Sequence, residues 1–432
     1  MTRQSTVPDA AKVAGPLIEM LFGRVPINFE FWDGSNLTPK DPAAKDGIAN
    51  VRLRSADALR HLLWSPNELG MARAFVTGEM EVEGDIFEAF RALRLGGTNL
   101  PRGLRVLPRV LTTAFRLGLI GRPLPPPPEE MHPRGKLHSF VRDAKVVRHH
   151  YDISNDFYRI VLGSSMTYSC ALFTDSAMSL AEAQVAKNDL VCRKLGLNER
   201  PGMRLLDVGC GWGSMALHAA RHYDARVVGV TISREQFKAA TRLVEQAGLA
   251  GRVEIRLEDY RLLRGERFDA ISSIGMSEHV GKAKIGEYFS TLTSLLSPQG
   301  RILNHAISSV GGSKLDRRTF MYRYVFPDGE LLDVGKTVLA MEDAGLEVRD
   351  VDSLREHYAL TLRAWVANLE SQWDTAVALV GVGRARVWRL YMAASAVGFE
   401  EGSLAIHQVL GVLPTAIGTS GIDLERKYRN GH

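Results

Sequence analysis

Strand-like and helix-like segments alternate through the C-terminal part of this chain of 432 residues. Runs rich in β-branched residues occur at "MRLLDVGC" (203–210), "ARVVGVTIS" (225–233), "RVEIRLED" (252–259), "FDAISSIG" (268–275) and "GRILNHAIS" (300–308). Segments with helical spacing of apolar residues lie between them at "MALHAARHY" (215–223), "REQFKAATRLVEQAGL" (234–249) and "IGEYFSTLTSLLS" (285–297). Strand, helix and strand at this spacing predict an α/β fold whose parallel sheet carries helices on both faces.

Composition is that of a globular protein, and the length suits two domains. Hydrophobic residues make up 45% and charged residues 24% of the chain, with a net charge of +5. The three cysteines, Cys170, Cys192 and Cys210, are too few and too scattered for a disulfide framework, which favours a reducing cytoplasm. No run of eighteen apolar residues is present, so we expect any membrane contact to be peripheral, and no basic stripe with stacking aromatics indicates nucleic acid.

A proline-rich stretch, "GRPLPPPPEEMHPRGK" (121–136), divides the chain. Four consecutive prolines cannot continue a helix or occupy a central strand, so this stretch predicts an extended linker. It separates an N-terminal domain, 1–120, from a C-terminal domain, 137–432. In the first of these we expect a helix over 65–78 with Ser65 as its N-cap and Pro66 in the first helical position.

The end of the N-terminal domain is basic and apolar. Residues 102–122 hold no acidic residue and five arginines, namely Arg102, Arg105, Arg109, Arg116 and Arg122. One interpretation is a surface that binds anionic lipid headgroups. The other is a helix on the core whose arginines lie in water, and Pro108 weakens the case for a single long helix.

Three closely spaced glycines follow the first strand of the C-terminal domain. In "LLDVGCGWGS" (205–214), Gly209, Gly211 and Gly213 permit unusual torsions and let a ligand lie against the main chain. The spacing is neither that of a dinucleotide-binding loop nor that of a P-loop. It is typical of S-adenosylmethionine (SAM) methyltransferases, in which Asp207 and the glycine loop would hold the methionine portion and Asp259 the adenine amine.

Further segments resemble one family of such enzymes. These are "HYDISNDFY" and "MTYSCALF" within 147–173, "GVTIS" followed by Gln236, "GMSEHVG" (275–281), "LNHAIS" (303–308), "YVFPDGEL" (324–331) and "REHYALTLRAW" (355–365). Together, over about 145–410, they are similar to cyclopropane-fatty-acyl-phospholipid synthases, which are SAM-dependent lipid methyltransferases. The two-domain form is most similar to actinobacterial members, some of which make the 10-methylene precursor of tuberculostearic acid. The resemblance implies a Rossmann-like, seven-stranded, mostly parallel sheet and a smaller N-terminal α+β domain.

The resemblance also implies the site residues. The expected SAM contacts are Tyr168, Ser169, Asp207, Gly209, Gly211, Gly213, Thr231, Ser233, Gln236, Asp259 and Tyr260. In the family a bound bicarbonate acts as the base, held here by Glu278, His305, Tyr358 and the main chain at Cys170, with a further contact at Ile307. No metal is implied, since no second cluster completes a site with His149 and His150.

The implied reaction is methyl transfer to the cis double bond of a phospholipid acyl chain, through a carbocation that aromatic faces can stabilise. Candidate aromatics are Tyr168, Phe173, Phe320, Tyr322, Tyr324 and Trp365. Ring closure gives a cyclopropane, whereas a hydride shift gives a methylene branch, which we slightly favour and which a separate reductase would saturate. Ser395 stands where family members often carry a cysteine, which leaves the product open.

Other functions remain open at this point. The enzyme could methylate another small or lipid acceptor, or the chain could be a lipid-binding relative without activity. The intact glycine loop, Glu278 and His305 argue against the inactive relative. We expect a cytoplasmic enzyme at the inner face of the membrane. A homodimer would present two basic faces and strengthen that attachment.

Overall fold

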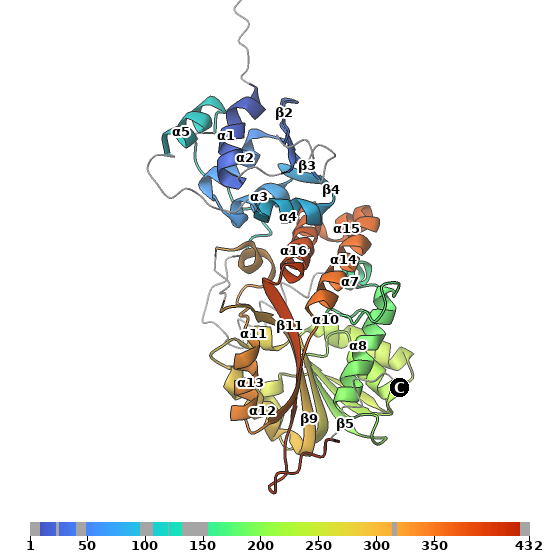
Figure 1. The fold of residues 1–432 in the computed structure, drawn as a ribbon. Coiled ribbons are helices and arrows are strands. Elements are labelled where there is room, and N and C mark those ends of the chain that lie inside the picture. The colour runs from blue at the N-terminus through green and yellow to red at the C-terminus, as the bar shows by residue number, and fades with distance from the viewer. Residues whose placement is uncertain are drawn as a thin grey trace, which may run out of the picture. The chain divides into compact units, whose positions relative to one another are not determined.

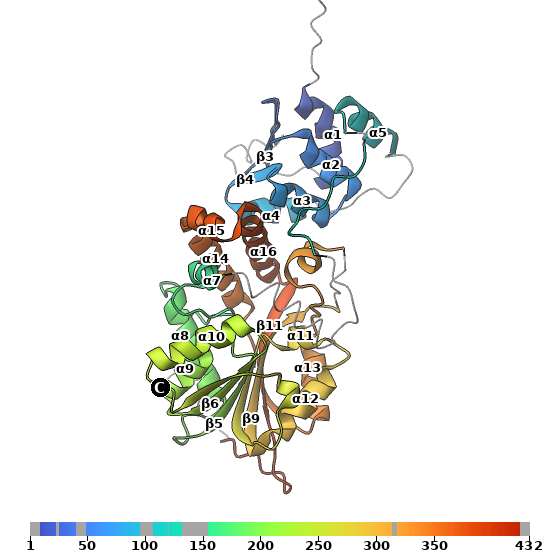
Figure 2. The same ribbon diagram turned by 180° about the vertical axis from the view of Figure 1, so that it is seen from behind.

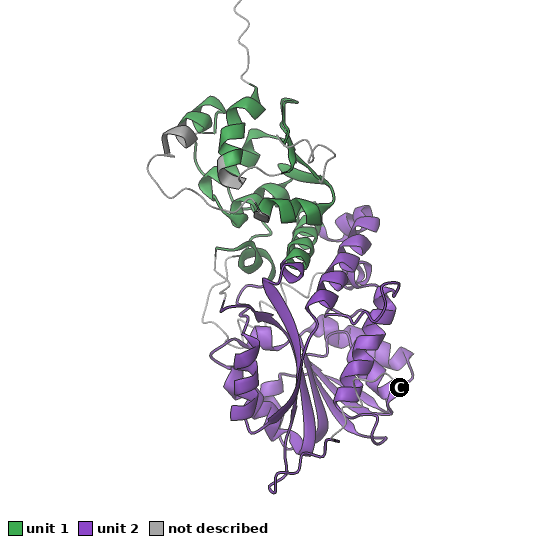
Figure 3. Cartoon of the chain, in the orientation of Figure 1, with its two compact units in different colours: residues 1–132, 317–325, 381–397 green, residues 133–316, 326–380, 398–432 purple. Residues whose placement is uncertain are grey.

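The computed structural model describes residues 9–22, 26–39, 49–95, 107–119, 121–131, 154–312 and 318–423. The chain forms two compact units, which Figure 3 distinguishes by colour. Unit 1 consists of residues 1–132, 317–325 and 381–397, and unit 2 of residues 133–316, 326–380 and 398–432. Two segments that the sequence-based boundaries assigned to the C-terminal domain therefore group with unit 1.

A seven-stranded sheet organises unit 2, in the order β10-β11-β9-β8-β5-β6-β7 (Figures 1 and 2). Its strands are β5 (Arg204–Val208), β6 (Arg226–Thr231), β7 (Val253–Leu257), β8 (Phe268–Ile274), β9 (Leu296–Ser309), β10 (Glu347–Ser353) and β11 (Leu404–Val412). β11 runs antiparallel to both β9 and β10, and the other pairs are parallel. The predicted α/β fold with a mostly parallel sheet is confirmed.

Helices cover both faces of this sheet, because neighbouring strand residues point to opposite sides. Leu205 and Val227 pack in a core with α8, α9 and α10, whereas Leu206 and Val228 pack with α12 and α13. The helices of this part of the chain are α7 (Asn155–Leu162), α8 (Leu180–Lys194), α9 (Ser214–His222), α10 (Arg234–Gln246), α11 (Ser277–Val280), α12 (Ile285–Ser294), α13 (Val334–Asp343), α14 (Arg355–Ser371), α15 (Trp373–Val380) and α16 (Val382–Glu400). Most of α16 groups with unit 1.

Unit 1 is a smaller α+β structure with a four-stranded sheet in the order β2-β1-β3-β4. The strands are β1 (Asn28–Glu30), β2 (Asn36–Leu37), β3 (Ala49–Leu53) and β4 (Met80–Gly84). The helices are α1 (Ala10–Phe22), α2 (Ala56–Trp64), α3 (Glu68–Thr77), α4 (Ile86–Leu95) and α5 (Leu107–Arg116). Phe29, Phe31 and Val51 of the sheet region pack against Leu17 and Leu59 in its core.

The predicted N-cap at Ser65 is wrong. α3 begins at Glu68, and the Asn67 side chain accepts hydrogen bonds from the main-chain N–H groups of Leu69 and Gly70. Ser65 instead ends α2, where its own N–H bonds the carbonyl of His61. Asn and Ser are about equally good N-caps, so local preference does not choose between Ser65 and Asn67. Ser65 is already the C-cap of the preceding helix, and Asn67 therefore caps α3.

Later segments complete unit 1. The buried Glu130 carboxylate, at the end of the described proline-rich stretch, forms a bidentate pair with Arg73 of α3 and accepts a hydrogen bond from the Tyr324 hydroxyl. Arg386 of α16 pairs with Glu81 of β4 at 2.8 Å. The end of the proline-rich stretch is thus anchored to unit 1.

Within the part of the chain that the structure describes, no helix is both long and apolar enough to cross a membrane.

Candidate functional site

The glycine loop leaves β5 at the carboxyl end of the sheet and leads directly into α9. Gly209, Gly211 and Gly213 all have positive φ, at 74°, 55° and 85°. A Cβ on Gly209 would lie 2.4 Å from the sulfur of Met276. The position therefore requires glycine both for its torsion and for the close approach of β5 and the segment after β8.

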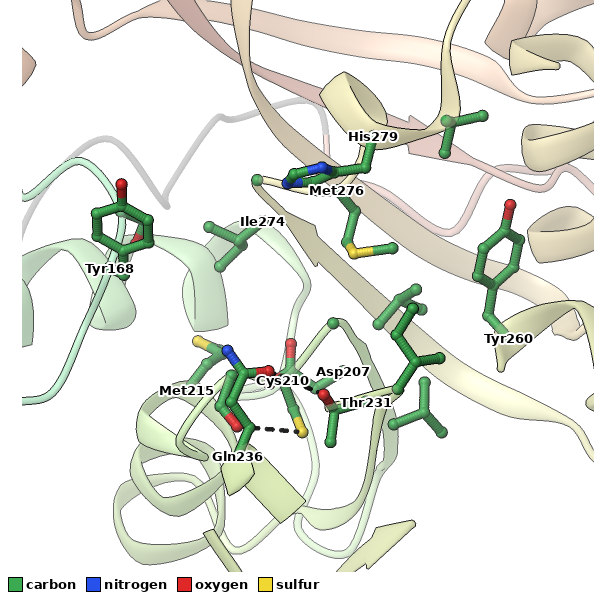
Figure 4. A pocket seen from close by; sticks show the side chains of 18 of the residues that line it. Tyr168, Asp207, Cys210, Met215, Thr231, Gln236, Tyr260, Ile274, Met276 and His279 are labelled. Atoms are coloured by element: carbon green, nitrogen blue, oxygen red, sulfur yellow. Dashed lines mark hydrogen bonds between the residues drawn. The ribbon is translucent and has the colours of Figure 1, made fainter. Parts of the chain in front are cut away.

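A cavity of about 440 Å³ opens above this loop (Figure 4). Its wall comes from the carboxyl ends of β5, β6, β7 and β8 and from the segment that precedes α8. This is the edge of an open parallel sheet at which ligands bind. The expected SAM residues that line it are Tyr168, Ser169, Asp207, Gly209, Gly211, Thr231, Gln236, Asp259 and Tyr260.

Two expected SAM residues do not line the cavity. Gly213 is the N-cap of α9, and a Cβ there would lie 3.3 Å from the Cβ of Ala240. The Ser233 side chain caps α10 by accepting a hydrogen bond from the Gln236 N–H. Both residues position helices behind the cavity wall, which spacing along the sequence does not distinguish from ligand contact.

Polar side chains along the cavity wall are arranged by local hydrogen bonds. The Thr231 hydroxyl donates to Gln236 Oε1 at 2.8 Å, which turns the Gln236 amide along the wall (Figure 4). The Asp259 carboxylate pairs with Arg261 at 2.7 Å, so part of its acceptor capacity is used within the chain. The ring of Tyr260 lies 5.0 Å from that of Tyr288 in an edge-on arrangement.

Two oppositely charged residue types are buried in the same wall. Burial raises the pKa of the Asp207 carboxyl to about 6, and Ser272 donates a hydrogen bond to its Oδ1 at 2.7 Å. Burial lowers the pKa of the Lys187 ammonium to about 8. Lys187, Met276 and His279 also line the cavity, although they are not among the site residues expected from the sequence. A detectable sign of Lys187 is that the inward face of α8 carries polar residues.

A second polar cluster lies at Glu278 and His305. Glu278 is in the first turn of α11, and its Oε1 accepts the main-chain N–H of Ile307 at 2.8 Å. Burial raises the pKa of the Glu278 carboxyl to about 7. Its Oε2 is buried and has no hydrogen-bond partner among the described residues. The carboxyl group can therefore hold or release a proton near neutral pH.

His305 lies on β9 opposite Gln408 of β11. Gln408 Nε2 is 3.2 Å from His305 Nδ1. With its nitrogen toward His305, the Gln408 amide donates to Nδ1, and the imidazole proton is then on Nε2. Burial lowers the pKa of His305 well below its usual value, which keeps the ring neutral. Nε2 is buried without a partner among the described residues, so it is a free donor.

Cys170 and Tyr358 connect to the same cluster through the main chain. The Leu354 carbonyl accepts from the Tyr358 N–H at 3.1 Å and lies 3.7 Å from Cys170 Sγ. The Leu354 N–H donates to Ile406 of β11, which is opposite Ile307. Burial raises the pKa of the Cys170 thiol, which disfavours the reactive thiolate. These main-chain bonds link the segments that carry Cys170, Tyr358 and Glu278.

The rings of Tyr168, Trp365 and Tyr358 lie next to one another. The Trp365 ring is 5.3 Å from that of Tyr168 and 6.0 Å from that of Tyr358. Phe320, Tyr322 and Tyr324 are buried in unit 1, where the Phe320 and Tyr324 rings lie 5.2 Å apart. Their proposed part in the reaction stays a prediction. His149 and His150 lie outside the described residues.

Comparison with known proteins identifies the family. Residues 138–409 match the family model described as mycolic acid cyclopropane synthetase. The chain belongs to this family. It is 42% identical over 90% of its length, and 91% of the relative, to the "Probable fatty acid methyltransferase Rv3720" of Mycobacterium tuberculosis. It is 33% identical to the cyclopropane-fatty-acyl-phospholipid synthase of Escherichia coli K12, over 84% of this chain and 87% of that one.

Solved structures agree with this assignment. The cyclopropane synthase MmaA2 of Mycobacterium tuberculosis is 31% identical, with a TM-score of 0.60, over 64% of this chain and all of its own. The mycolic acid cyclopropane synthase CmaA1, solved with S-adenosylhomocysteine (SAH) and CTAB, is 34% identical, with a TM-score of 0.59, over 62% of this chain and 98% of its own. The protein is therefore a SAM-dependent methyltransferase.

Proposed function

We propose that this enzyme transfers the methyl group of SAM to the cis double bond of an unsaturated acyl chain, such as an oleoyl chain, carried by a phospholipid. The observation that carries the proposal is the buried pair of polar atoms at Glu278 Oε2 and His305 Nε2, which have no partner among the described residues. An amine or hydroxyl acceptor also loses a proton, but it can lose that proton to water in an open site and does not need a buried proton acceptor. An alkene acceptor does, because a proton must leave a product cation that is kept from water.

The residues around this pair suit a small oxyanion. His305 Nε2 offers a neutral donor, and Glu278 near its pKa can donate or accept a proton. Bicarbonate, held by Glu278, His305, Tyr358 and the main chain at Cys170, would supply a weak base there, and the Ile307 main chain would act only through Glu278. The Ile307 N–H already donates to Glu278 and so orients the carboxyl group toward the cluster. The aromatic rings of Tyr168, Trp365 and Tyr358 exclude water and offer faces to a cation.

Relatives support both product types. One relative, 32% identical over 92% of this chain, is a tuberculostearic acid methyltransferase of Mycobacterium tuberculosis, whereas the E. coli relative is a cyclopropane synthase. We favour the methylene-branched product, which a separate reductase would saturate. The choice depends on whether the cation closes or shifts first, which pocket shape controls within about an ångström.

Mass spectrometry of lipids tests the proposal. Incubation with SAM and dioleoyl phospholipid vesicles is expected to add one methylene unit to the lipid mass. Mild hydrogenation then separates the products, since an exocyclic methylene takes up hydrogen and a cyclopropane resists. A mass gain on free fatty acid or on another acceptor, with none on phospholipid, would contradict the proposed substrate and favour the alternative methyltransferase.

Access to a bilayer substrate would use the basic end of the N-terminal domain at the inner face of the membrane. The last turn of α5 exposes Phe115 and Arg116 side by side, while Arg102 and Arg105 lie outside the described residues. An apolar ring next to arginines suits the headgroup region of an anionic membrane, where each cation adds about 1 kcal/mol. A homodimer would double this surface.

The double variant Phe115→Ala/Arg116→Ser is expected to weaken sedimentation with anionic vesicles several-fold in low salt, with a smaller difference in high salt. Trp64→Ala is the matched control, because Trp64 is also an exposed aromatic residue of unit 1. Equal vesicle binding by the double variant and the wild type would contradict peripheral attachment through α5.

A further inference from the structure

Lys187 is a buried cation in the wall of the SAM cavity. It lies on α8 and is 1% exposed. Its Nζ donates one hydrogen bond, to Ser169 Oγ at 3.2 Å. An ammonium group has three protons to donate. No carboxylate of the described residues lies within ion-pair distance of it, so its charge has no partner within that part of the protein.

Another buried lysine of the same helix is paired with carboxylates, as buried lysines usually are. Lys194, also fully buried, lies 3.1 Å from carboxylate oxygens of both Asp350 and Asp352. Burial without a partner costs several kcal/mol, and a cation that is buried without one is destabilising unless a ligand supplies the anion. Lys187 lines a cavity and Lys194 does not, which points to a ligand anion for Lys187.

The same cavity wall contains the Asp207 carboxylate, one oxygen of which has no hydrogen-bond partner among the described residues. Asp207 Oδ1 accepts from Ser272, but Oδ2 is buried with no partner among the described residues. Lys187 and Asp207 are close enough to influence each other's pKa, yet they do not form an ion pair. A cavity with one unpaired cation and one unpaired carboxylate is complementary to a zwitterion, in which a carboxylate and an ammonium group share one carbon.

We propose that Lys187, beside Ser169, binds the α-carboxylate of the methionine portion of SAM, while Asp207 faces its α-amino group. The inference rests on SAM occupying this cavity and is independent of the acceptor. Lys187 then acts as a specificity residue, because it raises the affinity for ligands that carry the α-carboxylate.

A different anion could use the same charge. The charge of Lys187 also lowers the pKa of His305, so it would act on an anion bound at the second polar cluster. The hydrogen bond to Ser169, which is itself in the cavity wall, favours the methionine carboxylate. An anion at the Glu278 and His305 cluster is the competing occupant that the experiment must separate.

Calorimetric titration with two ligands tests the inference. SAH carries the amino-acid end, whereas 5′-methylthioadenosine keeps the adenine, ribose and sulfur but lacks it. In Lys187→Met, the Kd for SAH is expected to rise about 10- to 100-fold, the effect of losing a charge-assisted hydrogen bond. The Kd for methylthioadenosine is expected to change by less than about threefold. Lys187→Arg, which keeps the charge, is expected to retain a preference for SAH.

Lys194→Met is the matched control, since it removes a buried lysine of the same helix outside the cavity. It is expected to lower thermal stability and leave the ratio of the two Kd values unchanged. Ligand-free Lys187→Met, in contrast, is expected to be as stable as the wild type or more stable, because an unpaired buried charge has been removed.

Equal weakening of both ligands by Lys187→Met would overturn the inference, as would an unchanged Kd for SAH. An unchanged Kd for SAH together with a higher bicarbonate requirement in turnover would assign Lys187 to the second anion instead. The proposed acceptor fails separately, in the lipid mass measurement. A wild type that binds SAH but methylates no phospholipid would leave the role of Lys187 intact.

Discussion

At Glu278, burial and hydrogen bonding act in opposite directions on one carboxyl group. Burial raises its pKa to about 7, while the Ile307 N–H favours the charged form. At His305, burial keeps the ring neutral, and the hydrogen bond from Gln408 to Nδ1 leaves Nε2 as the donor. Glu278 can therefore exchange a proton near neutral pH, whereas His305 can donate a hydrogen bond without carrying a charge.

This environment makes stability depend on pH. Between pH 4.5, the ordinary pKa of a glutamate, and about 7, the folded protein retains the Glu278 proton while the unfolded chain has lost it. The free energy of unfolding therefore falls as pH rises through this window and levels off above it. Glu278→Gln removes this loss, and at pH 8 the variant is expected to be more stable than the wild type by up to about 3 kcal/mol.

Urea denaturation at pH 8 and pH 5 measures the difference, which is expected to shrink at the lower pH. Glu342→Gln, at an exposed site on α13, is the control and should show no gain at either pH. Glu278→Gln should also bind SAH normally and lose most turnover. Full turnover by this variant would remove Glu278 from the proposed proton-transfer role.

Gly209 offers a test of the close approach in the cavity. An alanine there meets both the unfavourable torsion and Met276, so Gly209→Ala is expected to weaken SAH binding by more than about tenfold. Gly248→Ala is the matched control, because Gly248 also has positive φ but no heavy atom within 4 Å of an added Cβ. Similar SAH affinities for the two variants would show that Met276 simply moves aside.

Among the elements, α14 holds the segment that carries much of the site. The Thr361 hydroxyl accepts the main-chain N–H of Ala171 at 3.0 Å, and His357 Nδ1 accepts that of Phe173 at 3.2 Å. These bonds fix the segment that also contains Tyr168, Ser169 and Cys170. A segment without regular secondary structure is thus held in part by a helix that lies far along the sequence, in addition to its bonds with α8.

Thr361→Val preserves shape but removes the acceptor, leaving a buried N–H unsatisfied at a cost of about 1–3 kcal/mol. Faster hydrogen exchange at the Ala171 amide and a several-fold higher Kd for SAH are expected. Thr361→Ser restores the hydroxyl and should restore both properties. An unchanged exchange rate in Thr361→Val would mean that other contacts order the segment.

In the molecule as a whole, unit 1 depends on residues that come late in the chain. Glu68 of α3 accepts the main-chain N–H of Phe320, and Glu81 of β4 pairs with Arg386. The segment 381–397 also buries Trp388 and Tyr391. Removal of the first 132 residues would leave these partners and apolar side chains uncovered.

A truncated chain of residues 133–432 is therefore expected to be less stable than the full chain and to bind a hydrophobic dye such as ANS, although it contains the whole SAM cavity. Size-exclusion chromatography and dye fluorescence measure this. A truncated chain that stays monomeric, binds no dye and retains the SAH affinity of the full chain would contradict the expectation.

The sequence by itself determined β5 to β9, because strand and helix patterns are local, and the family resemblance added most of the expected residues that line the cavity. Strand and helix periods are set within a few residues, and a glycine loop directly after β5 lies at the carboxyl edge of any parallel sheet. The order β10-β11-β9, with β11 antiparallel, was not predicted, since pairing between distant strands has no local pattern.

Only the tertiary structure decided which side chains are buried without a partner. Lys187 and Lys194 are both lysines of α8 and cannot be told apart by sequence. Lys194 has two aspartates within ion-pair distance, whereas Lys187 lines the cavity. Gly213 and Ser233 match the family's pattern but pack behind the wall. The grouping of 317–325 and 381–397 with unit 1 also depends on contacts across hundreds of residues. Burial and charge pairing are properties of the packed chain, so the residues' local sequence does not specify them.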